Sequence, residues 1–366
     1  MARHRLLQLQ DKDLRLPAFL PDATSGYVRA VDSQDLIGVQ IQAVVMNTFH
    51  LMQKPGSSTI QAFGGLHKFS GWPGIIITDS GGFQAYSLIH ESDRFGSLSD
   101  RGIIFHPEGK DRKFILSPEK SIQLQISYDT NVVICLDDCT HVDAPREEQE
   151  LSVERTLSWA RRCKEEYLRQ MDQREITEDK RPLIFGVIQG GGYPDLRRKC
   201  AEGLLEMGFD GFGYGGWPLD AKGALLEDMV HLTRELVPPE YPMHALGIGH
   251  PLNLVKTYRL GYDIFDCALP TRDARHGRLM RFNISPDTPI PSDHDWLSYV
   301  YIQDKKYIKD NRPISEFCDC PVCQHYSVGY LHHLFKTGDW LFQRLATLHN
   351  LRFMTQLTER LYNHGA

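Results

Sequence analysis

Ile75-Ile-Ile-Thr-Asp79 and Val132-Val-Ile-Cys-Leu-Asp137 share one pattern, a short apolar run that stops on an aspartate. Their apolar character is nearly continuous, which is typical of strands in a parallel sheet that is covered on both faces. Six further runs stop in the same way at a polar residue or a glycine, at residues 16–22, 43–47, 183–189, 211–216, 244–249 and 263–266. The sequence therefore predicts eight strands of one parallel sheet.

Longer amphipathic segments separate several of these runs. Three of them, residues 147–170, 194–207 and 226–236, repeat apolar residues at helical spacing. Eight β–α units in about 270 residues predict an α/β fold of the (β/α)8 or TIM barrel type, with its active site where the strands end. A doubly wound open sheet is the alternative, but no glycine-rich phosphate-binding fingerprint follows the first strand.

The composition is that of an ordinary globular protein, with 366 residues of which 41% are hydrophobic and 24% are charged. No apolar run approaches the ~20 residues that a membrane span needs, and none near the N-terminus is long enough for a signal peptide. We therefore expect a cytoplasmic protein without membrane contact. The 41 Lys and Arg against 47 Asp and Glu give a net charge of −6, which by itself argues against a polyanionic partner.

Polar residues and glycines end most of the predicted strands. In a (β/α)8 barrel the strand ends meet at one mouth, so these residues converge however far apart they lie in sequence. The residues concerned are Asn47, Asp79, Asp137, Asp138, Gln189, Gly215, Gly216 and Asp266. One strand-end aspartate commonly caps a helix, but several carboxylates in one cleft repel one another and favour a functional interpretation.

The residue types at this mouth indicate chemistry on a sugar or a base. Two carboxylates that flank a glycosidic bond can act as nucleophile and as acid/base, through a covalent glycosyl-enzyme intermediate. An aspartate and a glutamine can read the donor and acceptor edge of a planar heterocycle. Backbone N–H groups of Gly215 and Gly216 can approach such a ring closely, and Phe83 offers a stacking surface.

At these residues the chain resembles the tRNA-guanine transglycosylases of the bacterial type. The matching segments follow in family order and span nearly the whole chain: Asn47-Thr-Phe-His-Leu51, Thr78-Asp-Ser-Gly-Gly-Phe-Gln84, Leu116-Ser-Pro-Glu119, Leu136-Asp-Asp-Cys-Thr140, Phe185-Gly-Val-Ile-Gln-Gly190, Gly208-Phe-Asp-Gly211, Gly215-Gly216 and Phe265-Asp-Cys-Ala-Leu-Pro-Thr-Arg272. Such a series is far more specific than any one short motif. The resemblance implies that guanine at the wobble position of the tRNA anticodon is exchanged for a 7-deazaguanine base, in queuosine biosynthesis.

Carried over residue by residue, the resemblance implies two catalytic carboxylates. Asp266 is the nucleophile that bonds to ribose C1′, and Asp79 is the general acid/base for the leaving and incoming bases. The residues that bind the base are Asp137, Gln189, Gly216 and Phe83. Two displacements at one carbon retain its configuration and need neither ATP nor a redox cofactor.

Three cysteines lie within six residues in the C-terminal part of the chain, Cys318, Cys320 and Cys323. In a reducing compartment a close group of thiolates with a histidine indicates a closed tetrahedral Zn²⁺ site, which is structural. A redox pair or surface cysteines are the alternative. His332 and His333 are nearer in sequence, but the resemblance selects His349 as the fourth ligand and implies one structural zinc ion per chain.

An arginine-rich segment directly follows Asp266. Residues 271–281 hold four arginines against one aspartate, a local charge of +3. So short a run is usually a solvated loop, although arginine contacts phosphates and base edges well. The resemblance implies that the tRNA anticodon loop is bound by Arg272, Arg275 and Arg278.

A stripe of aromatic residues follows the cysteine group. Tyr326, Tyr330 and His333 share one helical face, which fits a buried core face as well as an interface. The resemblance implies that this segment contributes to a homodimer. We divide the chain into a catalytic barrel, residues 1–285, and a zinc-binding subdomain with C-terminal helices packed on the barrel, residues 286–366.

The loop after Gly216 departs from the family pattern. Bacterial relatives carry small apolar residues and then a glycine–glutamate pair, whose glutamate helps to recognise an aminomethyl group on the incoming base. Here the sequence reads Trp217-Pro-Leu-Asp-Ala-Lys222, without that glutamate. We expect 7-aminomethyl-7-deazaguanine (preQ1) as the incoming base, with queuine or the cyano form as alternatives.

Two other functions fit the same resemblance. A non-catalytic RNA-binding partner subunit of a transglycosylase needs neither Asp79 nor Asp266, so the presence of both argues against it. A paralogue that inserts 7-deazaguanine into DNA is disfavoured by the intact cysteine group and arginine segment. We therefore expect an active enzyme. We expect it to act on tRNA despite its negative net charge, because the local positive charge between Arg272 and Arg281 matters more to binding than the net charge.

Overall fold

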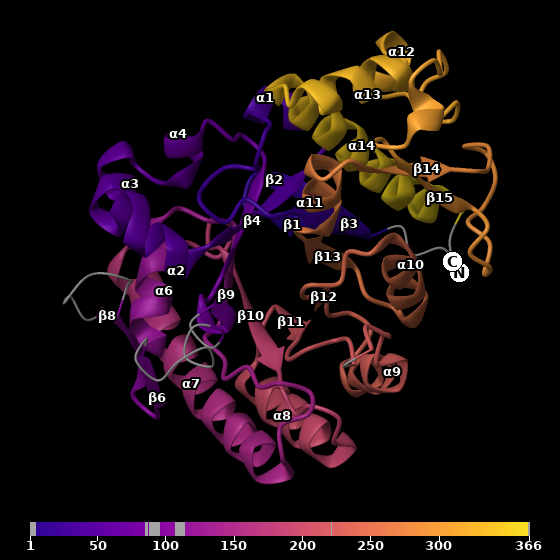
Figure 1. Ribbon diagram of the computed structural model, residues 1–366. Helices are drawn as coiled ribbons and strands as arrows, with labels where there is room; N and C mark the ends of the chain where they lie inside the picture. Colours follow the sequence, from indigo (N-terminus) through magenta and orange to yellow (C-terminus); the bar gives the residue numbers. More distant parts are fainter. Residues whose placement is uncertain (1–4, 85–86, 88–95, 107–113, 221, 365–366) are drawn as a thin grey trace.

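A computed structural model describes residues 5–84, 87, 96–106, 114–220 and 222–364 (Figure 1). Its centre is a parallel sheet of eight strands in chain order: β3 (Ala18–Pro21), β4 (Ala43–Asn47), β5 (Ile75–Asp79), β9 (Val132–Ile134), β10 (Leu183–Ile188), β11 (Gly211–Tyr214), β12 (Met243–Ala245) and β13 (Ile264–Cys267). β13 pairs with β3, and a parallel bridge between Asp22 and Val45 joins β3 to β4. The sheet thus closes into a barrel, and each strand overlaps a predicted run, which confirms the predicted fold class.

Helices surround the barrel (Figure 1). They are α1 (Ser33–Gly38), α2 (Thr48–Leu51), the π-helical turn η1 (Met52–Gly56), α3 (Ser57–Phe63), α4 (Leu66–Ser70), α6 (Pro118–Ser127), α7 (Arg146–Gln173), α8 (Pro194–Met207), α9 (Glu227–Leu236), α10 (Pro251–Leu260) and α11 (Leu269–Arg275). Proline in the first turn favours the start of α10, and Gly261 ends it in a left-handed conformation, with φ of 105°. The three predicted helices correspond to α7, α8 and α9.

The two ends of the barrel differ in chemistry. At the end where the strands begin, β1 (Arg5–Leu9) and β2 (Lys12–Leu16) form an antiparallel hairpin. Leu9, Leu14 and Leu16 of this hairpin pack on inward-facing residues such as Ile75 and Phe185. Because this end is filled with apolar side chains, the opposite end, where the strands stop, is the one that is open to a ligand.

Two further units are added to the barrel. Between β5 and α6 lies an antiparallel sheet of β6 (Gly96–Ser99), β7 (Gly102–Phe105) and β8 (Phe114–Leu116). After α11 come β14 (Arg278–Phe282), β15 (Leu297–Tyr301), the 3-10 turn η3 (Lys305–Tyr307), α12 (Pro321–His325), α13 (Val328–Thr337) and α14 (Trp340–His364). In the described part of the chain no helix is both long and apolar enough to cross a membrane.

α14 joins the C-terminal unit to the barrel. It runs beside α11 and β14 (Figure 1), and most of its length is buried. The Arg344 guanidinium on α14 donates to both carboxylate oxygens of Asp35 on α1, at 2.6 and 2.8 Å. β14 and β15 pair with each other and lie on either side of residue 285 in the sequence. The division of the chain into a barrel and a zinc-binding subdomain at residue 285 stays a prediction.

Candidate active site

A cleft of about 400 Å³ lies at the mouth of the barrel. Six of the strand-end residues predicted from the sequence line it: Asn47, Asp79, Asp137, Gly215, Gly216 and Asp266. Phe83 lines the same cleft from the segment that follows β5. The sequence-predicted carboxylates at positions 79, 137 and 266 are therefore brought together although almost 190 residues separate the first from the last.

Asp79 is the last residue of β5 and is held by two donors. Its Oδ2 accepts a hydrogen bond of 2.7 Å from the Asn47 amide, and its Oδ1 accepts one of 3.0 Å from the Gly81 N–H. Burial, helped by the nearby charge of Asp266, raises the pKa of Asp79 to about 7, against the opposing effect of these donors. A carboxyl group that titrates near neutrality can both give and take a proton.

Asp266 faces the cleft from β13, and its side chain keeps 20% of its surface exposed. Its Oδ1 accepts hydrogen bonds from His244 Nε2, at 2.9 Å, and from the Gly247 N–H, at 3.1 Å. The sequence analysis did not single out His244. A histidine at an inward-facing position of a barrel strand, next to the strand that bears Asp266, was the available signal.

Asp137 forms a pair with Gln189 at one wall of the cleft. Its Oδ2 accepts a hydrogen bond of 2.6 Å from Gln189 Nε2, and its Oδ1 accepts one of 3.4 Å from the Ser80 hydroxyl. Burial raises the pKa of Asp137 to about 6, against the effect of the Gln189 amide. Gln189 itself lies behind the wall and is fully buried, and its Oε1 has no hydrogen-bond partner among the described residues.

The glycine pair lies next to this buried amide. A Cβ at Gly215 would lie 2.6 Å from Gln189 Nε2, and Gly216 adopts a positive φ of 82°. Side chains at these two positions would clash or be strained. The pair therefore leaves the backbone of the wall close to whatever occupies the cleft.

Asp138 does not join the cleft, contrary to the expectation from the sequence. It is buried, and its carboxylate pairs with Arg155 on α7. Its backbone N–H donates to the Thr156 hydroxyl at 3.1 Å. Consecutive residues of an extended segment point to opposite sides, so Asp137 faces the mouth while Asp138 fastens the outer helix.

Aromatic side chains form the rim of the cleft. The rings of Phe83 and Trp217 lie 5.5 Å apart between centroids, and His141 lies 5.4 Å from Trp217. Asp220 is not a free carboxylate at this rim, because its Oδ1 accepts from the backbone N–H groups of Lys222 and Ala224, at 2.9 and 2.8 Å. The rim thus presents aromatic faces.

The three predicted RNA-binding arginines lie just beyond β13 and differ in their surroundings. Arg272 on α11 is exposed, whereas Arg275 and Arg278 are half-buried. Burial and the neighbouring Arg29 lower the pKa of Arg275, although Asp22 opposes them. Arg278 lies over the ring of Tyr299, at 3.9 Å.

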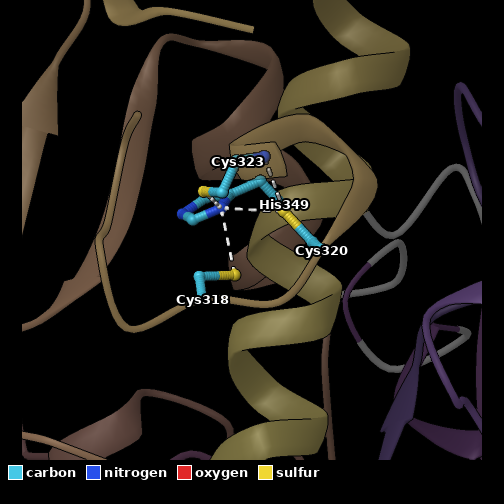
Figure 2. Close-up of side chains that lie close together, drawn as sticks. All are labelled: Cys318, Cys320, Cys323 and His349. Carbon is cyan, nitrogen blue, oxygen red and sulfur yellow. Dashed lines mark hydrogen bonds between the residues drawn. The ribbon is translucent and has the colours of Figure 1, made fainter. Parts of the chain in front are cut away.

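Cys318, Cys320, Cys323 and His349 come together at α12 and α14 (Figure 2). The sulfur atoms lie 3.7, 3.5 and 3.3 Å from His349 Nδ1, and all four ligand atoms lie within 4.8 Å of one another. The cluster can hold a metal ion. The other ring nitrogen of His349, Nε2, donates to the Met280 carbonyl at 2.6 Å, which leaves Nδ1 as a ligand.

Neighbouring residues keep this cluster in place and exclude a rival ligand. Arg352 on α14 binds both oxygens of Asp319, at 2.6 and 2.7 Å, and so fixes the turn between Cys318 and Cys320. His332 lies elsewhere, with its Nδ1 2.6 Å from the Ile302 carbonyl. His349 is therefore the histidine that completes the cluster.

Comparisons with known proteins agree with the motifs. The family model described as Queuine tRNA-ribosyltransferase matches residues 1–364. A queuine tRNA-ribosyltransferase of Psychrobacter cryohalolentis is 36% identical over 360 residues, which cover 98% of this chain and 88% of that protein. One of Staphylococcus epidermidis is 35% identical over 358 residues, or 98% of this chain and 87% of that protein. The resemblance is confirmed, and the chain belongs to the queuine tRNA-ribosyltransferases, which are tRNA-guanine transglycosylases and so glycosyltransferases.

Proposed function

We propose that this enzyme exchanges guanine at the wobble position of a tRNA anticodon for a 7-deazaguanine base, through a covalent bond between Asp266 and the ribose. The observation that carries the proposal is the pair of Asp79 and Asp266 in one cleft, with the pKa of Asp79 raised to about 7 by burial. One carboxylate can attack ribose C1′ while the other gives a proton to the leaving base.

The base lies against Asp137, Gln189, Gly216 and Phe83. Asp137 lines the cleft, and its carboxylate accepts from the N–H groups of the pyrimidine edge. The buried Gln189 Oε1, which lacks a described partner, and the Gly216 backbone complete the reading of that edge. Phe83 stacks on the ring, as its half-exposed position at the rim allows.

The incoming base is preQ1 in the first instance, with queuine second. The rim offers Trp217 and Phe83 where relatives carry a glutamate, and aromatic faces attract an ammonium group. Competition among preQ1, queuine and the cyano form for insertion into tRNA that carries guanine at the wobble position tests this choice. Insertion of the cyano form in preference to the other two would contradict it.

Guanine exchange tests the catalytic proposal against its two rivals. Wild-type protein is expected to incorporate radiolabelled guanine into tRNA and to leave DNA unlabelled. Asp79→Asn and Asp266→Asn are expected to abolish the exchange. A wild type without exchange would favour a non-catalytic partner subunit, and labelled DNA would favour a DNA-modifying paralogue.

The cysteine cluster holds one structural zinc ion. Tetrahedral bond lengths of about 2.3 Å to sulfur and 2.0–2.1 Å to nitrogen put S and N about 3.6 Å apart. The three S–Nδ1 distances, 3.3 to 3.7 Å, bracket that value. Metal analysis of the purified protein should give one zinc per chain, and none after His349→Ala.

The enzyme acts in the cytoplasm as a homodimer that binds the tRNA anticodon loop through Arg272, Arg275 and Arg278. Tyr326 and Tyr330, 36% and 39% exposed, stack on each other at 5.5 Å and form a face that a second copy can cover. Tyr330→Ala is expected to shift the protein toward monomer in sedimentation velocity. An unchanged sedimentation coefficient would contradict the proposed interface.

A further inference from the structure

His244 is a buried histidine that contacts the proposed nucleophile. It lies on β12, is fully buried, and places Nε2 2.9 Å from Asp266 Oδ1. The Gly247 N–H donates to the same oxygen at 3.1 Å. Oδ1 therefore holds two donors, whereas none of the residues that the structure describes hydrogen-bonds to Oδ2.

The hydrogen bonds of the ring define which nitrogen carries the proton. Nε2 faces an oxygen of Asp266 that also accepts from Gly247, so Nε2 is the donor. Nδ1 is buried and has no partner in the described part of the chain, so a second proton there would be a buried donor without an acceptor. His244 therefore donates to Asp266 through Nε2.

The orientation of His244 follows from its place on the strand. Its neighbours Met243 and Ala245 pack in the apolar layer outside the barrel. Side chains alternate along a strand, so His244 points into the barrel, where Asp266 lies on the adjoining strand. Packing alone would be served by an apolar side chain, since a buried polar ring is costly without a partner.

We propose that His244 is a positioning residue: together with Gly247 it occupies Asp266 Oδ1 and leaves Oδ2 as the oxygen that attacks the ribose. This inference rests on the proposed function, because it requires Asp266 to be the nucleophile. In the first displacement the Oδ2–C1′ bond forms and the C1′–N9 bond breaks. The electron pair leaves with guanine, and Asp79 supplies its proton.

The same donors serve the second displacement. In the ester, Oδ1 is the carbonyl oxygen and still accepts from both N–H groups. When N9 of the incoming base attacks C1′, the electron pair of the breaking bond returns to Oδ2, and the N9 proton passes to Asp79. Both donors then stabilise the carboxylate that leaves, so one fixed contact acts in each half of the exchange.

Two substitutions distinguish the effect of the His244 hydrogen-bond donor from the effect of its ring. His244→Phe keeps an aromatic ring and removes the donor, whereas His244→Gln restores an N–H at similar reach. We expect His244→Phe to lower kcat by about 10- to 100-fold. The rate at which the denaturant-stable enzyme–tRNA adduct forms in a single turnover should fall by the same factor. The KM values for tRNA and guanine should stay within about twofold, and His244→Gln should recover most of the rate.

Controls separate this inference from packing and from the proposed function. Phe185→Leu alters another inward-facing ring, two strands away from His244 on β10, and should keep the wild-type kcat. If His244→Phe does not fold, His244→Asn replaces it, because its amide is too short to reach Oδ1. The inference would be overturned if His244→Phe or His244→Asn formed the adduct at the wild-type rate. It would also be overturned if His244→Gln did not recover the lost rate. An adduct formed by Asp266→Asn would overturn the proposed function instead.

Discussion

The cleft and the cysteine cluster both bring titratable side chains together, but they differ in how far neighbouring residues compensate the burial of these side chains. In the cluster, His349 is fixed by the Met280 carbonyl, and the intervening Asp319 is held by Arg352. In the cleft, burial raises the pKa values of Asp79 and Asp137 to about 7 and about 6. In the cluster, hydrogen-bond and ion-pair partners thus compensate the burial of polar groups. In the cleft, the effect of burial on Asp79 and Asp137 outweighs that of their hydrogen bonds.

The largest expected effect is at Asp266, the proposed nucleophile. Asp266→Asn should reduce guanine exchange by about 10³-fold or more, since an amide oxygen is a poor nucleophile. The Tm should change little, because asparagine can still accept from His244 and Gly247 through its Oδ1. Exchange kinetics and differential scanning calorimetry on one preparation measure both. A large fall in Tm would mean that the cleft, too, is a stabilising site.

The cluster should show the reverse behaviour. Cys320→Ser is expected to lose the metal and to lower the Tm by about 5–10 °C, because metal binding free energy contributes to folding. Cys163→Ala, at another buried cysteine on α7, is the matched control and should keep the metal. Metal content and Tm are measured together. If Cys320→Ser keeps its Tm, the cluster does not stabilise the fold.

The fold was predictable where a local pattern carries it. Each of the eight barrel strands overlaps a predicted apolar run, because a strand that is covered on both faces needs apolar residues throughout. The N-terminal hairpin and the role of α14 were not predictable, since they depend on contacts between distant residues. Asn350 on α14, for example, is buried and donates to the Pro270 carbonyl at 2.9 Å, which no sequence period reveals.

The site was predictable to the level of residues but not of contacts. The strand-end rule found Asp79, Asp137 and Asp266, yet it also selected Asp138, whose carboxylate turns outward to Arg155. The rule counts positions and does not register which way a side chain faces. It also passed over His244, because an isolated histidine at the start of an apolar run carries no pattern of its own.

The next effect is on pH dependence. In its proposed role Asp137 accepts from the base only when it is ionised. The KM for guanine should therefore rise as the pH falls below about 6, by up to about tenfold per unit. Asp137→Asn should remove this dependence at the cost of a higher KM throughout. The ionisation of Asp79 should instead appear in kcat, around pH 7. A KM that stays flat from pH 5 to 8 would deny Asp137 its part in base binding.

The smallest effect expected is at the rim, and it concerns selection rather than rate. Trp217 lies 5.5 Å from Phe83, so an aminomethyl ammonium at this edge would meet aromatic faces, an attraction of about 0.5–1 kcal/mol at an exposed site. Trp217→Leu should therefore raise the KM for preQ1 about two- to fivefold more than the KM for uncharged guanine, whereas Trp217→Phe should preserve the ratio. Competition between the two bases measures it. Because Asp220 is already bound to the backbone of its own loop, an unchanged ratio in Trp217→Leu would mean that the charge of the incoming base is recognised outside this rim.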